Sequence, residues 1–211
     1  MGGQWLLGTV MKAAAPSLAF RQTGSYIIIE LFWNGTEGKM NFGFSYVGLV
    51  YLAMLMVPNL IWAAGNKPRD YERYAGKENR ALLAFERIGE ALVSAIALVF
   101  SDFNPRPRDA WCLWLAASFI LMLLYEAFWI RYFKSERTMR DFYRGFAGIP
   151  VAGATLPVAA FFLLGVYGKN IPMLLATIIL GVGHIGIHLA HAKDANNTRR
   201  EDASSADTVP S

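Results

Sequence analysis

The sequence predicts an all-α integral membrane protein: a bundle of five transmembrane helices, with its N-terminal side outside the cell and its C-terminus inside. Three observations support this fold class. Of the 211 residues, 55% are hydrophobic, and the mean hydropathy is +0.31. Only 17% are charged, against about a quarter in ordinary soluble domains. The apolar residues gather into stretches of about 20, the length that an α-helix needs to cross a bilayer core of roughly 30 Å.

Five segments have this length and composition. They are the ranges 42–64, 81–100, 111–130, 145–167 and 171–191. The first carries no charged residue, and the second is charged only near its start. Pro150 and Pro157 predict a kinked helix in the fourth, which a membrane tolerates where neighbouring helices satisfy the freed carbonyl groups.

Lysines and arginines are divided unevenly among the connecting segments. The connections after the first and third segments, together with the C-terminal tail, hold Lys67, Arg69, Arg73, Lys77, Arg80, Arg131, Lys134, Arg137, Arg140, Arg144, Lys193, Arg199 and Arg200. The other two connections hold only Arg106, Arg108 and Lys169. Because short cytoplasmic loops are enriched in Lys and Arg, the first set is predicted to face the cytoplasm. The net charge of +4 is then a topology signal, and no nucleic-acid partner is predicted.

The two ends of the chain fall outside this scheme. Residues 1–39 lack the charged leader of a signal peptide, and their apolar run SYIIIELFW is too short to span and contains Glu30. We interpret residues 1–39 as an extension upstream of a start at Met40; a genuine interfacial segment or a sixth crossing is the alternative. The transmembrane domain then covers residues 40–193. Residues 194–211, which lack aromatic side chains, are predicted to be a disordered cytoplasmic tail.

Gly181, Gly183 and Gly186 match the spacing of a dinucleotide-binding loop. That fingerprint requires a βαβ unit, with an acidic residue about 20 positions further on. A polar tail follows here instead of a second strand, so we interpret these glycines as small residues that let membrane helices approach closely. The single cysteine, Cys112, excludes a disulfide framework and a cysteine-based zinc site.

Histidines are confined to the fifth segment. His184, His188 and His191 are the three histidines of the chain, and their spacing of i, i+4 and i+7 puts them on one helical face. The helical rise puts His184 within the inner leaflet and His191 near the cytoplasmic surface. Ionisable side chains inside a membrane are costly and mark functional sites. At the surface, His191 could instead hydrogen-bond to lipid phosphate.

Charged side chains of two other segments are predicted at a similar depth. Glu86, Arg87 and Glu90 lie in the first turns of the second segment, and Glu126 lies near the end of the third. Both positions are on the predicted cytoplasmic side. The polar groups therefore converge on the cytoplasmic third of the bundle, which is the strongest functional signal in the sequence.

Three chemistries could use this polar layer. A metal ion, Zn or non-haem Fe, could be held by two or three of these histidines with one or two carboxylates, Glu90 and Glu126, because neutral imidazole and carboxylate suit these ions. The same groups could form a proton relay or an ion-coupled transport site. A lipid headgroup or anionic metabolite could instead bind the arginines at this depth, Arg87, Arg131, Arg140 and Arg144. A purely structural role, in which these charges pair with one another, stays open.

The polar layer supports three hypotheses about function. The first is a membrane protein that binds a metal, a small molecule or a lipid in a cytoplasm-facing pocket, with an enzyme acting on a lipid-soluble substrate as one form of it. The second is a transporter or channel-type subunit, although five helices are few and no internal repeat is visible. The third is a membrane scaffold without chemistry. The sequence leaves open whether the chain is an enzyme and whether it forms a homo-oligomer.

Five stretches of the chain resemble a small family of polytopic bacterial membrane proteins. They are MNFGFSYVGLVYLAMLMVPNLIW, ENRALLAFERIGEAL, SFILMLLYEAFWIRYF, GIPVAGATLPVAAFFLLGVYGKNI and GHIGIHLAH. The resemblance extends from Met40 to about Lys193 and leaves residues 1–39 outside it. It implies a multi-pass protein of the bacterial cytoplasmic (inner) membrane and implies no particular activity.

Overall fold

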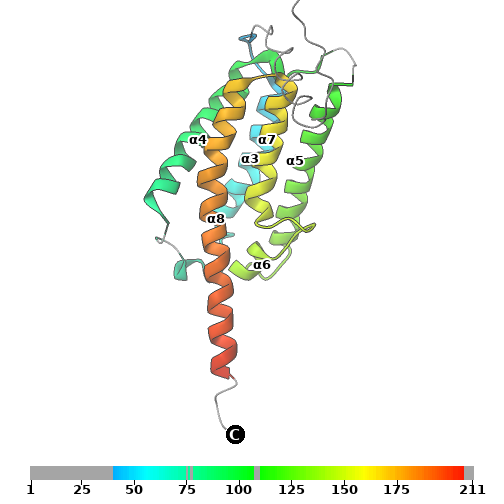
Figure 1. Cartoon of the computed structure of the whole chain (residues 1–211). Helices are drawn as coiled ribbons and strands as arrows, with labels where there is room; N and C mark the ends of the chain where they lie inside the picture. The colour runs from blue at the N-terminus through cyan, green and yellow to red at the C-terminus, as the bar shows by residue number, and fades with distance from the viewer. Residues whose placement is uncertain (1–39, 75, 77, 107–109, 207–211) are drawn as a thin grey trace, which may run out of the picture. The chain divides into compact units, whose positions relative to one another are not determined.

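The computed structural model of the chain describes residues 40–74, 76, 78–106 and 110–206. The interpretation of residues 1–39 as an extension lies outside the described residues. Within the described ranges the chain is all-helical and has no strand beyond isolated bridges, which confirms the predicted all-α architecture. The α-helices there are α3 (Tyr46–Ala63), α4 (Arg80–Val99), α5 (Cys112–Phe133), α6 (Met139–Tyr143), α7 (Ala152–Gly168) and α8 (Ile171–Ala206) (Figure 1).

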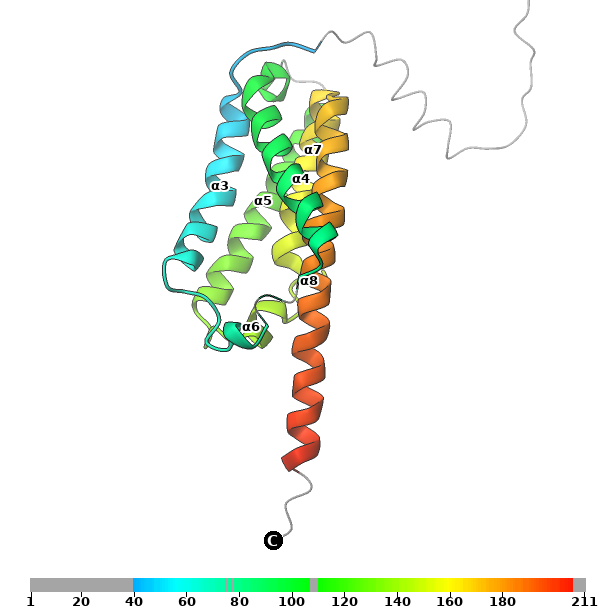
Figure 2. The ribbon, with the colours of Figure 1, turned by 90° about the vertical axis from the view of Figure 1, so that its left-hand side faces the viewer.

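Five of these helices lie side by side and run alternately up and down (Figures 1 and 2). The described residues of the connection 64–79, the connection 134–151 with the short helix α6, and the C-terminal part of α8 all lie at one end, which we call the α6 end. Residues 100–106, 110–111 and 169–170 lie at the other end. The two lysine- and arginine-rich connections therefore share one end of the bundle.

Three helices of the described chain are long and apolar enough to cross a membrane: α3, α5 and the Ile171–Thr198 part of α8. Their outer faces carry large apolar side chains that are more than half exposed, such as Leu60, Ile120 and Leu175. Contiguous exposed apolar surface of this kind is rare on soluble monomers. The structure is therefore that of a helical protein suited to a membrane.

Two helix boundaries differ from the sequence prediction. The fourth segment was expected to be helical from residue 145, but α7 begins at Ala152. Ala147, Gly148 and Val151 have positive φ angles of 51°, 74° and 42°, so the chain turns before the helix begins. At the other end, α8 continues to Ala206, into the segment 194–211 for which the sequence predicts disorder. A helix already nucleated in the bundle needs only to propagate, and Ala, Arg and Glu there favour it.

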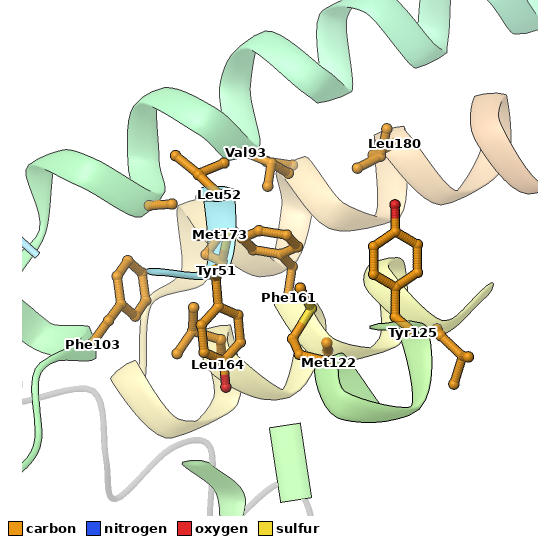
Figure 3. Packing of buried hydrophobic residues seen from close by; sticks show 14 of the residues in the cluster. Tyr51, Leu52, Val93, Phe103, Met122, Tyr125, Phe161, Leu164, Met173 and Leu180 are labelled. Atoms are coloured by element: carbon orange, nitrogen blue, oxygen red, sulfur yellow. The ribbon is translucent and has the colours of Figure 1, made fainter. Parts of the chain in front are cut away.

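Buried aromatic and aliphatic side chains fill the space between α3, α5 and α7 (Figure 3). The rings of Tyr51 and Phe161 meet edge to face, with centroids 5.8 Å apart. The Tyr51 hydroxyl donates to Ser118 Oγ over 3.0 Å, and Ser118 Oγ donates to the carbonyl of Ala160 over 2.7 Å. Each buried hydroxyl is thereby satisfied, and the chain of bonds ties the three helices together.

The backbones of α4 and α8 touch at glycines. A Cβ atom at Gly89 would overlap the backbone of Leu180, and one at Gly183 would overlap the backbone of Glu86 and the carbonyl of Leu82. The expectation that the glycines of this segment permit close helix contact is therefore confirmed at Gly183. Neither backbone can retreat without separating the two helices.

We predict that Gly183→Ala lowers the free energy of unfolding by about 1–3 kcal/mol, the cost of forcing an extra atom into a packed contact. Gly181→Ala is the matched control, because its Cβ would meet only side-chain atoms, Cγ1 of Val158 at 3.2 Å and Cδ1 of Ile185 at 4.0 Å. Both substitutions make the same change in helix propensity. Unfolding followed by circular dichroism in detergent measures the difference, and equal stabilities would contradict the predicted backbone contact.

Candidate functional site

A polar pocket of about 300 Å³ lies at the α6 end of the bundle. Its walls come from α4, α6 and α8, with Asn59 and Trp62 of α3, Trp129 of α5 and residues of the connection between α3 and α4. The side chains in it that can carry a charge are Glu78, Glu86, Arg87, Glu90, His184, His188 and His191, together with the hydroxyls of Tyr71 and Tyr143. The structure thus brings the three predicted histidines and Glu90 to one pocket.

Glu86, Glu90 and His184 form what we call the inner cluster. One potential ligand atom from each of the three residues lies within 4.8 Å of the others. His184 Nδ1 is 2.6 Å from Glu86 Oε1, a hydrogen-bonded pair whose side chains are 23% and 13% exposed. Glu90 is one helical turn from Glu86 and meets Arg87 at 3.3 Å, but that guanidinium is 73% exposed. The Arg87–Glu90 pair is therefore worth little, and Glu90 is available to a ligand.

Local structure explains how the inner cluster is assembled. The helix α4 begins at Arg80 because the side chain of Asn79 accepts a hydrogen bond from the N–H of Ala81 (2.8 Å). Two turns later, Glu86 packs against the glycine that precedes His184. The contact at Gly183 thus sets the distance between the carboxylates of α4 and the imidazole of α8.

His188 lies next to the inner cluster and is held by α6. Its ring centroid is 4.6 Å from that of His184, and its Nδ1 is 3.1 Å from the hydroxyl of Tyr143. Phe142 stacks on the same imidazole, with centroids 5.8 Å apart. Burial raises the pKa of the Tyr143 hydroxyl, so this group keeps its proton at neutral pH and stays a hydrogen-bonding partner for the ring.

Glu78 and His191 form what we call the outer pair. His191 Nε2 lies 3.6 Å from Glu78 Oε1, which is too far for a hydrogen bond. The helical rise predicts His191 near the membrane surface, and in the structure the residue is only 8% exposed. It is buried because Glu78, which lies two residues before α4, is next to this turn of α8. Among the described residues, His191 Nε2 has no hydrogen-bond partner.

Glu126, expected from the sequence as a metal ligand, does not line the pocket. On α5 it is one residue from Tyr125, which is buried, and three from Trp129, which lines the pocket wall. One residue along a helix is a rotation of about 100°, so Glu126 lies on a different face of α5. One of its carboxylate oxygens is buried and has no hydrogen-bond partner in the described chain.

The four arginines expected to bind an anionic headgroup do not gather in the pocket. Of that set only Arg87 lines it. Arg131 instead donates to the carbonyls of Arg144 (3.0 Å) and Gly145 (3.1 Å) and lies over the rings of Phe128 and Phe146. Its guanidinium thus holds the connection between α6 and α7 to α5.

Three pocket residues were not among the predicted ligands: Glu78, Glu86 and Tyr143. The sequence does hold a signal for Tyr143, because Thr138 and Asp141 form a capping box that starts α6. Glu86 was recognised as an ionisable group at the right depth, but its pairing with His184 depends on the rotation of two helices. The position of Glu78 depends on how the connection 64–79 folds, and no local pattern predicts that.

Together these features define a class: an all-helical protein with three helices able to cross a membrane and a His/Glu pocket at one end of the bundle. Comparison of the chain with protein-family models, curated proteins and solved structures finds no match in any of the three. The function is therefore inferred from the pocket alone. Three carboxylates face one largely exposed guanidinium there, a balance that favours cations.

Proposed function

We propose that the chain is a multi-pass protein of the bacterial cytoplasmic membrane, with five transmembrane helices, its C-terminus in the cytoplasm and the start of α3 outside. In addition to the three long apolar helices, α4 has 20 residues and α7 has 17. At 1.5 Å per residue these are about 30 and 25 Å long, close to the thickness of a bilayer core. Both pack against apolar spans, so they belong to the same lipid layer. The two basic connections at the α6 end support a cytoplasmic position for that end.

For this topology we predict that a reporter fused after Ser211 is active in the cytoplasm and inactive in the periplasm. A fusion in the connection 169–170 should give the opposite result, because Lys169 is the only basic residue there. Paired alkaline phosphatase and green fluorescent protein fusions measure both. Periplasmic activity of the C-terminal fusion would exclude the five-helix topology and favour a sixth crossing.

We further propose that the inner cluster binds a divalent metal ion, Zn²⁺ or Fe²⁺, at the cytoplasmic end of the bundle. The observation that carries this proposal is the approach of Glu86, Glu90 and His184 to within 4.8 Å of one another. Ligand atoms around a four-coordinate ion with bonds of about 2.0–2.2 Å are about 3.3–3.6 Å apart, so small rotamer changes suffice. A bound ion would take the place of the proton between His184 and Glu86.

Three protein ligands leave one position on a tetrahedral ion for water or a substrate. That position would open into the remaining volume of the pocket, beside His188 and Tyr143. An enzyme acting on a lipid-soluble substrate is compatible with this arrangement, because an ion-bound water has a lowered pKa and the neighbouring imidazole can accept a proton. No contact among the described residues specifically favours the transporter or the scaffold hypothesis.

We predict that the full chain, purified in detergent without chelator, carries Zn or Fe by elemental analysis. His184→Ala should lower the metal content by about one equivalent per chain, because a site that loses one of three ligands loses most of its affinity. Glu126→Gln is the control, since it removes a carboxylate of similar depth that does not line the pocket. A folded wild-type protein that stays metal-free in the presence of Zn²⁺ and Fe²⁺ would contradict the proposal.

A further inference from the structure

The inner cluster leaves the outer pair unexplained. His191 is a nine-tenths buried side chain that lines the pocket, and its Nε2 has no hydrogen-bond partner among the described residues. A buried ring nitrogen without a partner is unfavourable, because it has lost its water and gained nothing in exchange. Such an atom, facing a pocket, points to a ligand.

The separation within the outer pair suits a shared ion. A direct hydrogen bond would bring the two atoms to about 2.7–3.2 Å, whereas His191 Nε2 and Glu78 Oε1 are 3.6 Å apart. Two ligands of one four-coordinate ion, with bonds of about 2.0–2.2 Å, are about 3.3–3.6 Å apart. Glu86 and His184 of the inner cluster differ from the outer pair, since these two side chains are close enough to share a proton.

The charge balance of the pocket also favours a second cation. Glu86 and Glu90 together neutralise one divalent ion at the inner cluster. Among the described residues that line the pocket, Arg87 is the single guanidinium, and it is paired with Glu90 and largely exposed. In the described part of the chain, the cationic partner of Glu78 is then limited to a protonated His191. With about 30 Å³ per water, the pocket of about 300 Å³ has room for a second ion and its remaining water ligands.

We propose that Glu78 and His191 form a second binding site for a divalent transition-metal ion in the same pocket, nearer the α6 end than the inner cluster. The two protein ligands and water complete its coordination, so this site is more open and binds more weakly than the inner cluster. It goes beyond the proposed function, because neither of its residues belongs to the inner cluster and either site can exist without the other. His188 lies between the two sites on α8, one turn from His184 and three residues before His191.

The test is the Zn²⁺ stoichiometry of the full chain in lipid nanodiscs, stripped with a chelator and then titrated by equilibrium dialysis. Wild type should bind about two equivalents, and Glu78→Gln and His191→Gln about one each, because each removes half of the protein ligands of the weaker site. Glu72→Gln is the matched control: it changes an exposed glutamate in the same connection and should keep both equivalents. Helical circular dichroism checks that each variant is folded. If His191→Gln does not fold, Glu78→Gln alone provides the test, because Glu78 is partly exposed and its replacement is tolerated more easily.

The outcomes distinguish failure of the second site alone from failure of both metal sites. One equivalent in wild type, unchanged in Glu78→Gln, would overturn the second site and leave the inner cluster standing. No binding in wild type would overturn both. Loss of both equivalents in a folded Glu78→Gln variant would also overturn the second site, because the outer pair would then belong to a single shared centre.

Discussion

Close contact between the backbones of α4 and α8 is the constraint on which the pocket depends. The helix α4 carries the carboxylates and α8 carries the imidazoles, so the two chemical halves of the site come from different helices. Only glycine at positions 89 and 183 allows the backbones to come near enough for Glu86 to reach His184 at 2.6 Å. Larger residues there would move the helices apart, and the carboxylates of α4 would no longer reach the imidazoles of α8. The glycines therefore matter for the site as much as the charged residues do.

The rest of the bundle closes the pocket around that contact. The connections 64–79 and 134–151 are joined by hydrogen bonds from the N–H of Met139 to Asp70 Oδ1 (2.8 Å) and from the N–H of Arg69 to the carbonyl of Arg137 (2.9 Å). This junction holds α6 against α8, where Tyr143 and Phe142 contact His188. Two connections far apart in the sequence thus form one cover, and the polar groups under it are partly shielded from solvent. Shielding of this kind strengthens every electrostatic contact inside the pocket.

Much of this architecture could be predicted from the sequence, because the helices follow from apolar length and the shared face of His184 and His188 follows from helical period. The glycine contact at Gly183 could be predicted for the same reason. The position of Glu126 outside the pocket lining shows the limit. Depth along a helix can be counted from the sequence, but which face meets the neighbouring helix depends on the packing of both. The burial of His191 could not be predicted, since it depends on the path of a loop more than 100 residues away in sequence. The late start of α7 depends on left-handed backbone at residues that are not all glycine.

The most direct test of the central claim is to locate the ion relative to the two helices. Anomalous diffraction at the zinc edge, from crystals of the full chain grown with Zn²⁺, reports that position without any assumption about activity. The account predicts that the strongest anomalous peak lies between α4 and α8. That peak should be within bonding distance, about 2.0–2.2 Å, of Glu86, Glu90 and His184. A map with zinc only on the outer surface of the bundle, and none between these three side chains, would contradict it.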